Sequence, residues 1–161
     1  MATSIAISLG GTGTTGYSPS AEFIRDKIRS SLLELHKPEF YFSVLKKVLP
    51  ELIEVKNQTA EAGWDGYSAN PIGTETFARA YTLLEVLPNH IPPPTVGAEP
   101  DGDITLEWYH SPHRTLSVSI STEGDLHYAA LIGPNKAYGT EVFYGEAPIG
   151  ILDLIRRVYA G

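Results

Sequence analysis

A serine, a histidine and a glutamate occupy positions from which they could act together as nucleophile, base and acid. Ser119, His127 and Glu107 lie on three segments in which apolar and polar residues alternate, so each is on the polar side of an expected β-strand. A serine hydroxyl becomes nucleophilic when a histidine accepts its proton and a carboxylate holds that histidine in place. These residues predict, as one alternative, a small hydrolase or a ligand-binding domain.

The surroundings of Ser119 differ from those of a typical catalytic serine. A nucleophilic serine usually sits at a strained turn or a helix start, close to backbone amides that stabilise an oxyanion, whereas Ser119 is in the middle of a strand. The chain also has no Gly-x-Ser-x-Gly nucleophile elbow. Solvated strand positions therefore explain the three residues better than a catalytic set does.

A Gly-x-Gly-x-x-Gly motif formed by Gly11, Gly13 and Gly16 follows a strand-like segment at residues 5–7. This order is that of a loop that binds a dinucleotide or a phosphate. In such a loop a helix begins within the motif, so that its first amides face the phosphates, but residues 17–19 delay the helix here. Weak nucleotide binding at these glycines is a second alternative, and a flexible Gly/Ser/Thr arm over residues 1–19 is the preferred interpretation.

Two histidines, His110 and His113, flank the expected tip of a hairpin. Imidazoles three residues apart can bind a metal ion, and Asp101 or Asp103 could add oxygen ligands. A turn gives the two rings no common face, in contrast to a helix, so we interpret them as exposed turn residues. We predict neither a metal site nor a cofactor.

Trp64, Asp65 and Tyr67 form the most promising binding surface in the sequence. Aromatic residues in loops are common at protein interfaces, because they bury a large area with few rotatable bonds, and Asp65 could anchor a partner's arginine. Alternatively, Trp64 and Tyr67 close one end of the core while Asp65 forms the turn. Two further residues, Tyr41 and Leu45, belong to an apolar helical seam that we also expect to contact a partner.

The periodicity of the chain predicts the helices that position these residues. Apolar residues recur at helical spacing over residues 21–35, 41–55 and 74–87, and again from residue 148 to the end. Ser20 and Thr74 are suitable N-caps. Pro50 either kinks the second helix or starts a new one.

Alternating apolar residues predict strands at residues 95–99, in three runs within 103–132, and at 138–144. If the apolar residues of neighbouring strands lie opposite one another on one face, Trp108 pairs with Leu116 and Ile120 pairs with Leu126. This register puts Thr105, Ser119 and His127 in one polar row, and Glu107, Ser117 and Ala129 in the next.

The expected fold is therefore α+β: an antiparallel β-meander of four to five strands, packed by a preceding and a C-terminal helix, with an N-terminal helical subdomain. Residues 1–19 form the arm, residues 20–61 the helical subdomain and residues 62–161 the sheet module. The helices of residues 20–61 pack either on the same core or on a second copy, and the sequence leaves both open.

The composition of the chain excludes several classes of protein. The chain has 161 residues and 42% hydrophobic content, enough for a core, while the absence of cysteine excludes disulfides and thiolate metal sites. The first residues lack a basic region, and no run approaches the roughly 20 apolar residues of a spanning helix. We expect a cytoplasmic protein with no membrane association.

The two parts of the chain differ in charge. Residues 1–60 carry seven Lys/Arg against six Asp/Glu, whereas residues 61–161 carry five against thirteen. Phosphate repulsion disfavours nucleic-acid binding through the acidic part, because such binding normally depends on Lys and Arg. The partner we expect is another protein, with a basic protein as one candidate, or a second copy of the chain.

Two segments together resemble a recurrent family of small uncharacterised bacterial proteins. The segments are WDGYSANP at residues 64–71 and PDGDITLEW at residues 100–108, and the resemblance covers about the last hundred residues. It implies no settled activity. Proteins of this kind tend to be encoded as accessory genes in mobile or defence-related regions, so the resemblance implies an interaction factor. We accordingly predict a non-enzymatic protein-interaction or accessory protein.

Overall fold

The computed structural model describes residues 19–34 and 43–160 of the chain. The glycine motif of Gly11, Gly13 and Gly16 lies outside the described residues, and so does Tyr41. The nucleotide-binding hypothesis and the proposed contact at Tyr41 therefore stay predictions.

The strands within these two ranges form one five-stranded antiparallel sheet, in which each strand pairs with the next along the chain. This β-meander confirms the predicted fold class. Its strands are β1 (Thr95–Ala98), β2 (Ile104–Ser111), β3 (Arg114–Ile120), β4 (Asp125–Ile132) and β5 (Asn135–Val142). The predicted register is also confirmed, because Trp108 lies opposite Leu116 and Ile120 lies opposite Leu126.

The fifth strand begins earlier than the predicted segment at residues 138–144. A two-residue turn joins β4 to β5, and within it Gly133 has a φ of 62°, a conformation that glycine adopts without steric cost. Pro134 completes the turn, so pairing resumes at Asn135 opposite Ile132. The strand therefore starts directly after the turn. Its first residues are polar, so the sequence pattern did not predict this early start.

The described residues contain four helices: α1 (Pro19–Glu34), α3 (Val44–Gln58), α4 (Thr74–Val86) and α5 (Ile149–Tyr159). Helix α1 begins at Pro19, so Ser20 lies inside the helix instead of capping it, and proline suits a first helical position. Helix α3 runs through Pro50 without ending. Its N-cap is Ser43, whose hydroxyl accepts a hydrogen bond from the backbone N–H of Lys46 at 3.2 Å.

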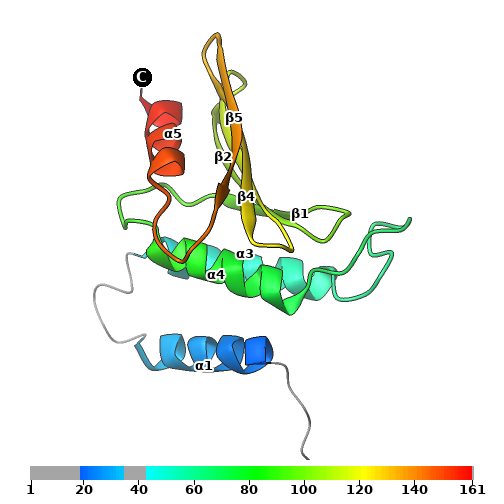
Figure 1. Cartoon of the computed structure of the whole chain (residues 1–161). Coiled ribbons are helices and arrows are strands. Elements are labelled where there is room, and N and C mark those ends of the chain that lie inside the picture. The colour runs from blue at the N-terminus through cyan, green and yellow to red at the C-terminus, as the bar shows by residue number, and fades with distance from the viewer. Residues whose placement is uncertain (1–18, 35–42, 161) are drawn as a thin grey trace, which may run out of the picture.

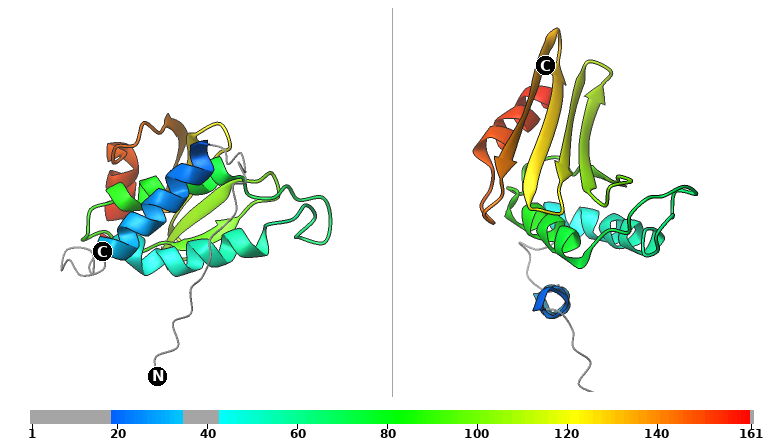
Figure 2. Two further views of the ribbon diagram at one scale, coloured as in Figure 1. Left: turned by 90° about the horizontal axis from the view of Figure 1, so that it is seen from below. Right: turned by 45° about the vertical axis from the view of Figure 1, so that its right-hand side comes forward.

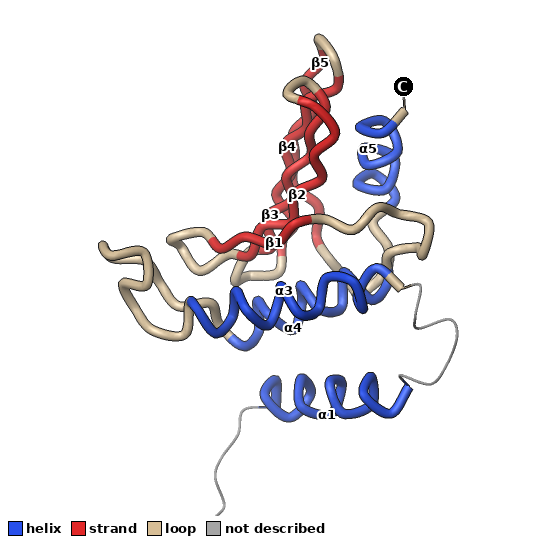
Figure 3. The backbone as a smooth tube through the Cα atoms, turned by 180° about the vertical axis from the view of Figure 1, so that it is seen from behind, coloured by secondary structure: helices blue, strands red, loops and turns tan. Residues whose placement is uncertain are grey.

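The described helices cover one face of the sheet, and none of them lies on the other face. Helix α5 packs on β2, β3 and β4, and α4 contacts β2 and β3. Figure 1 shows α5 on one side of the upright strands, and Figure 3 shows the strands standing on the α3–α4 pair from behind. Helix α1 lies beyond that pair, on the far side from the sheet (Figure 2).

One continuous core joins these elements. It includes Trp108 of β2, Leu116 of β3, Leu84 of α4 and Ile155 of α5, each at most 1% exposed. Helix α3 contributes four buried residues to the same cluster, namely Val44, Leu45, Val48 and Leu52. The apolar seam of α3 is therefore covered by its own chain.

Candidate functional site

The uncovered side of the sheet, which we call the open face, carries the polar residues of the alternating strands. The register places its side chains in three rows across β2 to β5. These residues are Thr105, Ser119, His127 and Thr140; Glu107, Ser117, Ala129 and Tyr138; and Tyr109, Thr115, Leu131 and Lys136. The open face therefore brings together Ser119, His127 and Glu107 on adjacent strands, as the sequence predicted.

The hydrogen bonds on this face do not connect Ser119 to His127. The hydroxyls of Ser119 and Thr105 both donate to one carboxylate oxygen of Glu99, and the two hydroxyl oxygens are 3.4 Å apart. The Nδ1 atom of His127 instead lies 2.9 Å from the hydroxyl of Thr140. The Ser119 hydroxyl thus donates its hydrogen bond to a carboxylate, whereas in a hydrolytic triad the serine hydroxyl donates to histidine.

Glu99 also lies on the open face, although the sequence pattern did not predict it as a site residue. It follows the end of β1, and its backbone N–H bonds the carbonyl of Asp103 at 2.9 Å, so it continues the ladder between β1 and β2. Gly97 lies opposite Thr105 in the same ladder. The alternation along β1 places Glu99 on the polar face of the sheet. Its contact with Thr105 and Ser119, however, depends on the pairing of β1 with β2.

A buried carboxylate, Asp103, lies next to this network and is 9% exposed. Burial is the main cause that raises the pKa of Asp103, and the nearby charges of Asp101 and Glu99 raise it further. A hydrogen bond from the backbone of Thr122 and the proximity of His127 act in the opposite direction. Carboxylates are therefore crowded at the end of the sheet nearest the β1–β2 turn.

The open face is acidic and contains exposed tyrosines. By register, Glu99, Asp103, Glu107 and Asp125 point to this side, and Lys136 is the basic residue of its three rows. Tyr109 is 57% exposed and Tyr138 is 83% exposed. A shallow groove of about 330 Å³ runs between Tyr138, Leu131 and Thr115. Tyrosine is enriched at protein–protein interfaces, and the carboxylates determine which charge on a partner this face attracts.

Residues 64–71 form a loop that projects from the end of the α3–α4 layer, on the side away from α5 (Figure 1). Asp65 organises this 64–71 loop, because its Oδ1 accepts the backbone N–H groups of Tyr67 at 2.8 Å and of Ala69 at 3.2 Å. The indole N–H of Trp64 donates to the carbonyl of Asn70 at 2.9 Å. Trp64 and Asp65 therefore hold the loop in shape.

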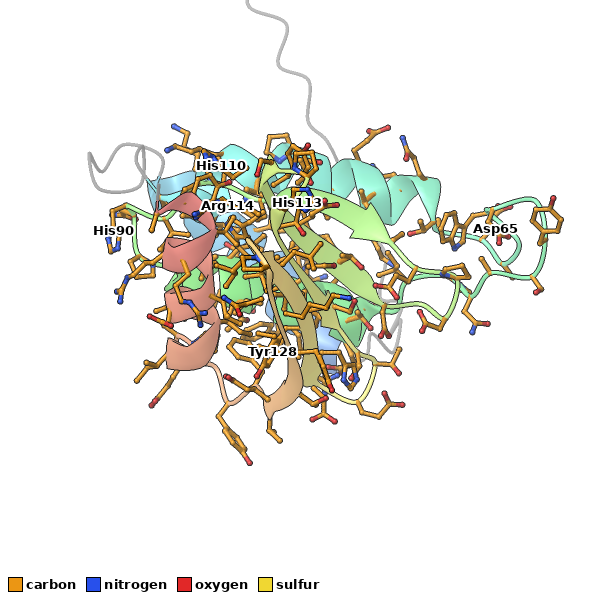
Figure 4. All side chains as sticks on the ribbon, turned by 90° about the horizontal axis from the view of Figure 1, so that it is seen from above. Asp65, His90, His110, His113, Arg114 and Tyr128 are labelled. Carbon is orange, nitrogen blue, oxygen red and sulfur yellow. The ribbon has the colours of Figure 1, made fainter. Side chains whose placement is uncertain are left out.

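The side chain of Tyr67 has no such internal role, since it is 89% exposed. Asp65 fixes the backbone on which Tyr67 stands, and Figure 4 shows Asp65 far out on the projecting loop. Gly66 has a φ of 83°, which turns the chain just before Tyr67. The result is a tyrosine presented to solvent on an ordered support.

The loop rests on the turn that precedes β2. The backbone N–H of Asn70 donates to the carbonyl of Pro100 at 2.7 Å, and its side-chain amide reaches the carbonyl of Asp101 at 3.4 Å. At that turn Gly102 has a φ of 97°, and a Cβ there would lie 3.4 Å from the carbonyl oxygen of Pro71. The two sequence segments that carry the family resemblance are thus in direct contact.

Other expected site residues have structural roles. Leu45 is 2% exposed within the core, so the monomer presents almost none of its side chain to a partner. The His110 ring packs edge to face on Tyr159 at 5.4 Å, close to Arg114, whose guanidinium donates to the carbonyls of Arg157 and Ala160. Figure 4 shows His110 and Arg114 beside α5, and His113 farther from that helix.

None of the helices in the described ranges has the length and apolar character required to cross a bilayer. Within the same residues, no group of three or more His, Cys, Asp or Glu side chains has an arrangement suited to a metal ion. Comparison of the chain with protein-family models, curated proteins and solved structures gave no match.

Proposed function

We propose that this chain is a non-enzymatic protein-interaction module that binds a basic protein partner through the open face and the 64–71 loop. The observation that carries the proposal is the presentation of Tyr67, 89% exposed on a loop that Asp65 orders, on the same side as a sheet face that no described helix covers. Ordered aromatic side chains bind with a small entropy cost, because the support is already fixed.

Charge favours a basic partner over an acidic one. Residues 61–161 carry thirteen Asp/Glu against five Lys/Arg, and Glu99, Asp103, Glu107 and Asp125 lie on the open face itself. Such a field accelerates the approach of a cationic surface and repels nucleic acid. The family resemblance extends the proposal to an accessory protein of a bacterial mobile or defence system, whose partner would be part of that system.

The hydrolase alternative has less support. Ser119 donates to Glu99, and His127 bonds Thr140, so neither residue has the partner that acyl transfer requires. The side chains act instead as a hydrogen-bonded polar surface. We therefore assign Thr105, Ser119 and His127 to the contact surface and not to catalysis.

Affinity capture from the native host tests the proposal. The wild-type chain should retain one protein in stoichiometric amount, and the double variant Tyr67→Ser/Tyr138→Ser should lose it. Tyr144→Ser is the matched control, because Tyr144 is 85% exposed but belongs to the segment between β5 and α5. That segment lies away from the 64–71 loop (Figure 1). Loss with the control variant, or equal retention by all three chains, would contradict the proposed surface.

A further inference from the structure

Residues of α1, α3 and α4 together line a groove. Helix α1 lies on the side of the α3–α4 pair that faces away from the sheet (Figures 1 and 3). The volume of the groove is about 320 Å³, and its apolar walls are Ile24 and Ile28 of α1, Ile53 of α3 and Phe77 of α4. Small-molecule pockets typically measure ~300–1,000 Å³, so this groove suits a ligand at the small end of that range.

Lys56 is the charged residue among those that line the groove. Its ammonium donates a hydrogen bond to the carbonyl of Ile72, which uses one of its three N–H donors and leaves two for a ligand. Burial also lowers the pKa of Lys56, because the ammonium is partly removed from water. A partly dehydrated cation in an apolar wall gains from an anionic partner.

We propose that this groove binds a small amphipathic carboxylate, with the carboxylate group on Lys56 and the apolar body against Ile24, Ile28 and Phe77. A neutral apolar ligand would fill the walls but leave the ammonium without an anion. A cationic ligand would be repelled, and a compact hydrophilic anion would leave the apolar walls in water. The site lies on the opposite side of the α3–α4 pair from the sheet, so it is separate from the open face.

Methyl NMR titration of the full chain with octanoate tests the site. We expect saturable shifts of the Ile24, Ile28 and Ile53 methyl groups, weaker binding of octanol, and no binding of octyltrimethylammonium. Lys56→Met keeps the length of the side chain but removes its charge, so octanoate should bind about tenfold more weakly. Lys47→Met is the matched control, because it removes the same charge from an exposed position of α3 and should leave binding unchanged.

A second pair of variants covers the case in which Lys56→Met does not fold. Ile28→Glu introduces an anion into the groove and should abolish octanoate binding, while Ser30→Glu adds the same charge at an exposed position of α1 and should not. The proposal is overturned if octanoate causes no saturable shifts, if the shifts map to other residues, or if octanol and octanoate bind wild type equally. Unchanged binding to folded Lys56→Met, or to Ile28→Glu, would overturn it as well.

Discussion

Asn70 donates its backbone N–H to the carbonyl oxygen of Pro100 at 2.7 Å, which joins two parts of the chain that are 30 positions apart. Through this bond the 64–71 loop is fixed to the turn that leads into β2, and so to the open face. Tyr67 is therefore supported by the same framework as the sheet. This relationship makes the loop and the open face one candidate surface.

Trp64→Phe should loosen the 64–71 loop. The substitution keeps an aromatic ring but removes the indole N–H that donates to Asn70 at 2.9 Å. A hydrogen bond of this kind contributes about 1 kcal/mol, so the melting temperature should fall by about 2–4 °C. Tyr67→Ser, at a side chain that is 89% exposed, should leave it within error. An unchanged melting temperature for Trp64→Phe would show that the indole does not hold the loop.

Gly139→Ala should destabilise the sheet. A Cβ at Gly139 would lie 2.5 Å from the hydroxyl oxygen and 2.8 Å from Cζ of Tyr128, so the ring on β4 would have to move. Overpacking of this kind costs about 1–3 kcal/mol in unfolding free energy. Gly97→Ala is the control, because its Cβ would meet Thr105 only at 3.9 Å and should cost little.

A double-mutant cycle, measured by urea unfolding, tests whether the Tyr128 ring causes the loss of stability in Gly139→Ala. If the Tyr128 ring is responsible, Gly139→Ala should cost much less in a Tyr128→Ala background. An equal cost in both backgrounds would mean that the backbone of β5, and not the ring, rejects the methyl group.

The alternation of the sequence and the short turns between its strands predicted the sheet register together. A slip of one residue would move every apolar residue of a strand to the polar face, and short turns limit larger slips. The same kind of reasoning could not place Leu45, since an apolar helical seam has the same pattern whether it packs inside the chain or contacts a partner. Nor could it find Glu99, because this carboxylate reaches Ser119 only after β1 has paired with β2. Local patterns thus predict elements and faces, while contacts between distant segments need the tertiary structure.

Asp103→Asn should stabilise the protein at neutral pH. The raised pKa of Asp103 means that the folded chain binds its proton more tightly than the unfolded chain, so the ionised carboxylate lowers stability at pH 7. Asparagine is neutral, yet it can still accept the backbone hydrogen bond from Thr122. Its advantage should shrink as the pH falls toward the ordinary aspartate pKa of about 3.9, where the wild-type carboxyl is protonated.

Thermal unfolding of both chains between pH 7 and pH 4 measures this difference. A variant that is less stable than wild type at pH 7 would mean that the charge of Asp103 stabilises the fold. A difference that stays constant with pH would mean that its titration is not involved.

Ser119 should be inert toward a fluorophosphonate probe. Such probes label serines that a neighbouring base activates, whereas the Ser119 hydroxyl donates to Glu99. The intact mass of the chain should therefore not change, under conditions that fully label a serine hydrolase in parallel. A single adduct that disappears in Ser119→Ala would restore the hydrolase alternative and count against a purely non-enzymatic role.

Site-specific photocrosslinking in the native host tests the central claim most directly. A photoreactive phenylalanine analogue replaces Tyr67, Tyr138 or, as the control, Tyr144, all three of which are more than 80% exposed. We predict one crosslinked protein with a basic surface from positions 67 and 138, its yield falling as salt is raised, and none from position 144. Crosslinks from position 144 alone, or from no position, would contradict binding through the open face and the 64–71 loop.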